Sequence, residues 1–204
     1  MPISLVLFDM DDVLCHYDRS ARVRHLSALS GRTQEEVVHA IWTSGLEARA
    51  DAGIVDDAEY LRETSNLLGC HVSEQDWLQA RRTAMSPNVE VLALAEAVSA
   101  ECHIAVLTNN PRIVAMNIEY LCPPVAHLFG THVYASASFK SAKPAAQTFL
   151  RCLGTLGMSP QETLFVDDLE ANVDGARQAG LDAHVFTHYG LLFDCLKEHG
   201  LLER

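Results

Sequence analysis

The sequence predicts an α/β fold: a doubly wound, Rossmann-like parallel sheet with a helical module inserted after the first strand. Short apolar runs that end at polar residues occur at residues 3–8, 103–107 and 163–166, as is typical of strands buried on both faces. Stretches with helical periodicity follow the second and third runs. Because strands that alternate with helices form parallel sheets, these patterns favour the doubly wound class.

The remaining elements of the sheet domain follow from the same patterns. Two more strands are expected at residues 183–186 and, with a weaker pattern, at 132–135. Helices are expected at residues 89–100, 113–121, 145–156 and 171–179. In such sheets ligands bind outside the carboxyl ends of the strands, so the polar residues that follow the strands are the candidate site.

Residues 17–86 interrupt the alternation with about four predicted helices and no clear strand. Helix N-cap patterns occur at Thr33–Glu36, at Ser73–Asp76 and at Asp56. Pro87 marks the expected return to the sheet. We therefore predict one domain made of residues 1–16 and 87–204, with residues 17–86 as an insertion.

Composition narrows the classes of function. The net charge of −12, from 15 basic and 27 acidic residues, argues against a nucleic-acid binder, which needs clustered cations. No basic start and no apolar run of ~18 residues occurs, so neither a signal peptide nor a membrane span is expected. The six cysteines form no C-x-x-C pair, which favours reduced thiols and a cytoplasmic location.

The first candidate cluster is Asp9, Asp11 and Asp12, directly after the first predicted strand. Asp9 and Asp11 are two residues apart, which places both carboxylates on one side of the chain. These acids repel one another unless a cation lies among them, and oxygen ligands suit Mg²⁺. The alternative is a solvated acidic turn that caps a helix.

Three further polar clusters follow later strands. They are Thr108 with Asn109 and Asn110, then Lys143 before Pro144, then Asp167 and Asp168 with Asn172. Hydroxyl and amide groups can hold phosphate oxygens, and a lysine can neutralise them. Taken singly, the first is also an ordinary N-cap, the second a solvated turn and the third a helix cap.

Together and in this order, the four clusters resemble the motifs of haloacid dehalogenase-like hydrolases. The resemblance runs from Ile3 to about Leu181, and residues 17–86 stand where that family inserts a helical C1-type cap domain. Two positions depart from the family pattern. Asp12 stands where glycine is common, and Asp tolerates the left-handed conformation better than most residues. Lys140 replaces a usual glycine and competes with Lys143, which the adjacent proline favours.

The resemblance implies roles for the chemical groups. Asp9 would be the nucleophile and Asp11 the general acid and then base. Thr108 and the Asn109 backbone would bind the phosphoryl group, and Lys143 would neutralise its charge. The implied Mg²⁺ ligands are Asp9, the Asp11 carbonyl and Asp168, with Asp167 acting through water and Asn172 orienting the loop.

The function implied is a magnesium-dependent phosphatase that acts on a small phosphorylated metabolite, a sugar phosphate or nucleotide, through an aspartyl-phosphate. A phosphomutase and a non-catalytic relative that only binds are the alternatives. The carboxylate at Asp11 argues against the 2-haloacid dehalogenases, which lack it. The order of the clusters argues against a receiver-type signalling domain, and the lack of G-x-G-x-x-G argues against a dinucleotide-binding oxidoreductase. No nucleic-acid or membrane partner is expected, and the oligomeric state stays open.

In the predicted cap, polar and aromatic side chains are candidates for contact with the leaving group. Packing among the helices is the alternative for each of them. The candidates are His16, Tyr17, Asp18, His39, Trp42 and Arg49.

Overall fold

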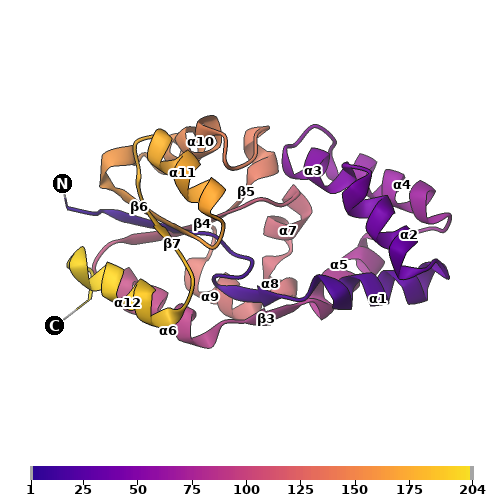
Figure 1. Cartoon of the computed structure of the whole chain (residues 1–204), viewed down its shortest axis with the longest axis horizontal. Coiled ribbons are helices and arrows are strands. Elements are labelled where there is room, and N and C mark those ends of the chain that lie inside the picture. The colour runs from indigo at the N-terminus through magenta and orange to yellow at the C-terminus, as the bar shows by residue number, and fades with distance from the viewer. Residues whose placement is uncertain (1, 203–204) are drawn as a thin grey trace.

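The computed structural model describes residues 2–202 and contains a parallel five-stranded sheet (Figure 1). The strand order is β5-β4-β1-β6-β7, and every neighbouring pair is parallel. The strands are β1 (Leu5–Phe8), β4 (His103–Thr108), β5 (Val133–Ala135), β6 (Thr163–Asp167) and β7 (Asp182–Val185). The predicted doubly wound α/β class is confirmed.

Helices cover both faces of the sheet, because alternate residues of each buried strand point to opposite sides. Leu5 and Leu7 pack with α10 (Ala146–Leu156) and α11 (Glu170–Gln178). Val6 and Phe8 pack on the other face, which α6 (Val89–Ser99), α9 (Pro123–Phe129) and α12 (Tyr189–Glu198) cover. Figure 1 shows these two helical layers above and below the sheet.

Five α-helices between β2 and β3 form a separate body at one end of the sheet (Figure 1). We call residues Arg19–Thr83 the helical insert. The helices are α1 (Arg19–Ser30), α2 (Gln34–Val38), α3 (Leu46–Asp51), α4 (Asp57–Leu68) and α5 (Glu74–Thr83), with a π-helical turn, η1 (His39–Thr43), after α2. The three predicted N-caps are confirmed, since Thr33 and Ser73 form capping boxes and Asp56 accepts from the Glu59 amide.

Several features of the structure differ from the sequence prediction, and one is α9, which the sequence did not predict. Short strands β2 (Cys15–Tyr17) and β3 (Met85–Pro87) pair antiparallel where the insert leaves and rejoins the sheet domain. Three residues are too few to show a period of two, so the pattern missed them. The helix expected at 113–121 is broken at Asn117 into α7 (Arg112–Met116) and α8 (Ile118–Leu121). The Asn117 side chain donates to the Ile113 carbonyl (2.9 Å), which satisfies a group at the end of α7.

The tail after Tyr189 forms α12, which the sequence did not predict as a helix. Leu192 and Leu196 of α12 are fully buried, so this helix covers part of the core. Two 3₁₀ turns, η2 (Ser136–Phe139) and η3 (Pro160–Glu162), complete the elements. No helix in residues 2–202 has both the length and the apolar composition needed to cross a bilayer.

The helical insert makes close contact with the sheet domain beyond α3. A Cβ atom at Gly53 would lie 2.4 Å from the Ala137 carbonyl oxygen, and Gly53 has a φ of +64°. The Ser136 hydroxyl donates to the Asp51 carbonyl (2.7 Å). A residue at position 53 therefore must be small and tolerate the left-handed region, and α3 ends directly above η2.

Candidate active site

The polar clusters meet at one edge of the sheet. In the parallel register, Phe8 lies opposite Val106 of β4 and Val166 of β6. Asp9 follows β1, and it therefore lies beside the ends of the two neighbouring strands, where Thr108 and Asp167 stand. This convergence follows from the parallel direction of the strands.

Lys143 lies between two carboxylates. Its Nζ atom is 2.8 Å from Asp9 Oδ1 and 2.7 Å from Asp167 Oδ2, and its side chain is fully buried. Burial alone would lower the pKa of Lys143, but Asp9 and Asp167 raise it, so the amine stays charged. Burial raises the pKa of Asp9 well above its usual value, with Lys143 opposing and Asp167 adding to the rise.

Asparagine side chains hold this ion pair in place. Asn109 Nδ2 donates to the Lys143 carbonyl (2.9 Å), and Asn109 Oδ1 accepts from the Lys143 amide (2.8 Å). Asn172 Nδ2 donates to Asp167 (3.0 Å to Oδ1), which also accepts from the Leu169 amide. The Asn109 side chain thus positions Lys143, a contact that the sequence did not predict.

The two candidate lysines lie in different surroundings. Lys143 contacts Asp9, whereas Lys140 is exposed and has a φ of +48° at the end of η2. The structure therefore places Lys143, and not Lys140, in the site. Asp12 adopts the expected left-handed conformation, with a φ of +59°.

Asp11 is turned toward the helical insert. Its Oδ2 accepts from Arg81 of α5 (2.5 Å) and from Asn110 Nδ2 (3.1 Å). The same Asn110 amide donates to the Thr108 hydroxyl (2.8 Å). Arg81 is buried, and its guanidinium lies 4.2 Å from the centre of the Tyr17 ring.

Sequence reasoning missed Arg81, because 70 positions separate it from Asp11 and no local motif marks it. Asn110 belongs to the predicted cluster of Thr108, Asn109 and Asn110, but no role was expected for its side chain. Its position two residues after Thr108 was the available signal.

Three carboxylates form a group that fits a divalent cation. Ligand atoms of Asp9, Asp167 and Asp168 lie within 4.8 Å of one another. Burial raises the pKa of Asp168 to about 6, and the nearby charges of Asp167 and Asp12 contribute to the rise. A cation among these hard oxygen donors would relieve the repulsion, so the residues fit Mg²⁺. The Asp11 side chain is outside this group, and the predicted ligand there is its main-chain carbonyl.

A cavity of about 400 Å³ opens above these groups, between the sheet domain and the helical insert. The sheet side contributes the acids and the Thr108 loop. The insert contributes Arg19, Trp42, Glu47, Asp51 and Arg81. The cavity therefore offers charged groups from both bodies to one small molecule.

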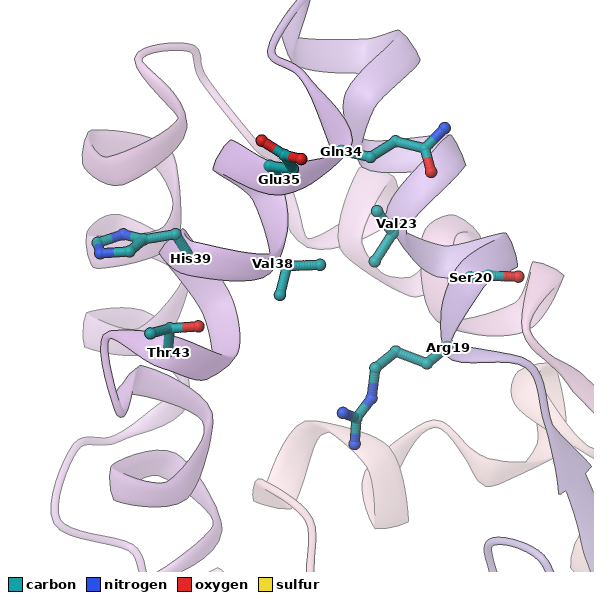
Figure 2. Close-up of a pocket in the computed structure, with 8 residues that line it drawn as sticks. All are labelled: Arg19, Ser20, Val23, Gln34, Glu35, Val38, His39 and Thr43. Carbon is teal, nitrogen blue, oxygen red and sulfur yellow. The ribbon is translucent and has the colours of Figure 1, made fainter.

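A second pocket of about 470 Å³ lies within the insert, between α1 and the α2–η1 segment (Figure 2). Figure 2 shows Val23 and Val38 beside this pocket and Arg19 at one end. Arg19 lines both this pocket and the cavity beside the acids. His39 lines only the second pocket, and Arg49 pairs with Glu63 (2.9 Å), so neither reaches the acids.

A family model of haloacid dehalogenase-like hydrolases matches residues 3–180. The chain belongs to this family. The match spans the sheet domain and the helical insert, and it includes all four polar clusters.

Two relatives of this haloacid dehalogenase-like hydrolase are phosphatases by name. Phosphatase MT3486 of Mycobacterium tuberculosis is 29% identical, over 93% of this chain and 90% of its own length. The fructose-1-phosphate phosphatase YqaB of Escherichia coli is 26% identical, over 84% of this chain and 82% of its own length.

The family enzyme BT-2542 of Bacteroides thetaiotaomicron, solved with magnesium and inorganic phosphate, has a similar structure. Its TM-score is 0.77 at 22% identity, over 94% of this chain and 99% of the other. At that identity the likeness shows a common fold.

Proposed function

We propose that this protein is a magnesium-dependent phosphatase that hydrolyses a small phosphorylated metabolite of the sugar phosphate or nucleotide class. One observation carries the proposal: a buried lysine joins Asp9 to Asp167, with the Asp11 carboxylate and the Thr108 hydroxyl at the same edge of the sheet. Phosphoryl transfer needs a nucleophile, an acid–base group and concentrated positive charge in one place. The phosphatase names of two relatives and the magnesium and phosphate bound by BT-2542 support the same class.

In the proposed reaction, a carboxylate oxygen of Asp9 attacks phosphorus, and the bond from phosphorus to the leaving oxygen breaks. Lys143 neutralises charge on the phosphoryl oxygens, and the Thr108 hydroxyl and Asn109 amide orient them. Mg²⁺, held by Asp9, the Asp11 carbonyl and Asp168, with Asp167 nearby, would supply further positive charge beside the phosphate.

Asp11 would carry the proton in both halves of the reaction. Arg81 and Asn110 occupy its Oδ2, which leaves Oδ1 facing only the thiol of Cys15 (3.7 Å) among the described residues. A proton at Oδ1 would pass to the leaving oxygen, and the resulting carboxylate would accept a proton from the water that attacks the phosphoaspartate.

We also propose that residues 17–86 act as the cap domain of a core made of residues 1–16 and 87–204. The cavity between them, with lining residues from both, supports this division. A cytoplasmic location and the lack of a nucleic-acid partner stay predictions of the sequence.

The test is phosphate release from a panel of phosphorylated metabolites and from nitrophenyl phosphate, with magnesium or with chelator. We expect turnover that needs magnesium and is lost in Asp9→Asn, which keeps the shape of the side chain but removes the nucleophile. Phosphorus NMR on the same reactions separates the alternatives, since a mutase would form an isomeric phosphate ester instead of inorganic phosphate. No turnover by the folded wild type with magnesium would refute the phosphatase.

A further inference from the structure

Arg81 reaches Asp11, the proposed acid–base group, from the helical insert. It belongs to the last turns of α5, and its side chain is buried. Its Nη2 atom donates to Asp11 Oδ2 (2.5 Å). The sheet domain supplies the second donor to the same oxygen, which is Asn110 Nδ2 (3.1 Å). One oxygen of the Asp11 carboxyl is therefore held by one donor from each body.

The Arg81 guanidinium is itself fixed in place. It lies 4.2 Å from the centre of the Tyr17 ring in β2. The Tyr17 amide donates to Asp12 Oδ1 (3.0 Å), which ties β2 to the loop after β1, and Tyr17 pairs with Met85 of β3. A planar guanidinium can stack on an aromatic ring and bind a carboxylate at the same time. The position of Arg81 is thus set where the insert joins the sheet domain.

The surroundings of Arg81 favour a role at the site over a role in stability. Within residues 2–202 its guanidinium makes one hydrogen bond, to Asp11, although it offers five donors, and its buried Nε has no partner. Arg22, a buried arginine inside the insert, makes three hydrogen bonds to Glu47 and Tyr60. A buried cation with so few partners contributes little net stability.

Donors at Oδ2 determine which oxygen of Asp11 carries a proton. In a protonated carboxyl the other oxygen still accepts hydrogen bonds, so Arg81 and Asn110 can stay bound in both halves of the proposed reaction. We propose that Arg81 is a positioning residue, which holds Asp11 by Oδ2 so that Oδ1 gives its proton to the leaving oxygen and then takes one from the attacking water. This inference rests on the proposed phosphatase function and gives the insert a part in proton transfer.

The experiment compares kcat/KM, with magnesium, for two esters of similar shape. Nitrophenolate is a stable anion that leaves without a proton, whereas the more basic phenolate of phenyl phosphate needs one. The variants are Arg81→Met, Arg81→Lys and a matched control, Arg82→Met. Arg82 is exposed, follows Arg81 in α5 and does not line the cavity, so the control also removes one positive charge. Circular dichroism establishes that each variant is folded.

We expect Arg81→Met to lower kcat/KM about tenfold or more for phenyl phosphate and less than about threefold for nitrophenyl phosphate. Arg81→Lys should keep more of the phenyl phosphate activity, since an ammonium still donates to a carboxylate. Arg82→Met should match the wild type on both esters. In an Asp11→Asn background, Arg81→Met should cause little further loss, because a positioning residue acts through Asp11.

A residue that only supports the fold, or that binds the phosphoryl group itself, would affect both esters alike. Equal losses on the two esters in Arg81→Met, or an equally large further loss in the Asp11→Asn background, would therefore overturn the inference. If Arg81→Met does not fold, Arg81→Lys decides, and a loss on phenyl phosphate no larger than that on nitrophenyl phosphate contradicts the role.

The wild type separates failure of this inference from failure of the proposed function. Folded wild type that hydrolyses neither ester would refute the phosphatase and the inference with it. Turnover of both esters by the wild type, with an unchanged ratio of the two kcat/KM values in Arg81→Met, would refute the role of Arg81 alone.

Discussion

A buried ion pair inside the helical insert predicts a large loss of stability when one of its partners is removed. The Arg22 side chain is fully buried, and its two terminal nitrogens contact the carboxylate oxygens of Glu47 at 2.6 and 3.4 Å. Arg22 also donates to the Tyr60 hydroxyl (2.9 Å), and Tyr60 donates to Glu47. The guanidinium lies 4.8 Å from the centre of the Trp77 ring. One side chain thus joins α1, α3, α4 and α5.

Arg22→Met keeps an unbranched apolar chain of similar length but leaves Glu47 without its cation. Burial opposes the charged form of Glu47, yet Arg22 outweighs burial, so the pKa of Glu47 is lowered. Removing one partner of a buried pair costs about 3–5 kcal/mol. We therefore expect the free energy of unfolding to fall by about 3 kcal/mol or more.

The matched control is Arg49→Met. Arg49 makes two contacts to Glu63, at 2.9 and 3.0 Å, but the side chains are 42% and 28% exposed. Exposed pairs contribute about 0–1 kcal/mol, so the control should lose less than about 1 kcal/mol. The contrast isolates burial, since both changes remove an arginine from the same insert.

The assay is urea unfolding followed by tryptophan fluorescence, because both tryptophans, Trp42 and Trp77, belong to the insert. Circular dichroism reports the whole chain in parallel. The double variant Arg22→Met/Glu47→Met should recover much of the loss, since an apolar pair leaves no buried charge. Equal losses in Arg22→Met and Arg49→Met, or a double variant less stable than Arg22→Met, would refute the reasoning.

Three further predictions concern the sheet domain. Lys143→Met should lower the rate of phosphate release by about 10²–10³-fold, because it removes the cation beside Asp9. Lys140→Met should keep a rate near that of the wild type, since Lys140 is exposed, and equal effects of the two changes would contradict the role of Lys143. Gly175→Ala should destabilise the fold by about 1–3 kcal/mol in thermal unfolding, since its Cβ would lie 2.1 Å from the Pro144 carbonyl oxygen. Gly154→Ala should stabilise the fold by about 0.5–1 kcal/mol, because Gly154 lies within α10 and a Cβ there meets open space. Burial opposes protonation of His199, but its bond to Asp182 (2.8 Å) outweighs burial and raises the pKa of His199. The pair therefore stabilises the fold below pH 6.5, by under about 1 kcal/mol, and this gain is lost as pH rises through the folded-state pKa. His199→Gln should abolish this dependence of the unfolding free energy on pH, measured by urea unfolding.

Local spacing was enough to predict the sheet and the positions of its polar clusters. Buried strands, helix caps and the turn at Asp12 depend on residues within a few positions of one another, and these interactions are present in the sequence itself. Because the predicted strands are parallel, Asp9, Thr108 and Asp167 could be placed at one edge of the sheet before any side-chain contact was known.

The contacts between distant elements required the tertiary structure. Arg81 of the insert pairs with Asp11 of the sheet domain, and Arg22 pairs with Glu47 between α1 and α3 of the insert. The periodicity of apolar residues along the sequence does not predict which side chains contact one another across a cavity. Such contacts depend on how the helices pack and not on spacing along the chain. The sequence by itself determined which polar clusters meet at one edge of the sheet, and only the packing of the helical insert decided which of its groups line the cavity beside them.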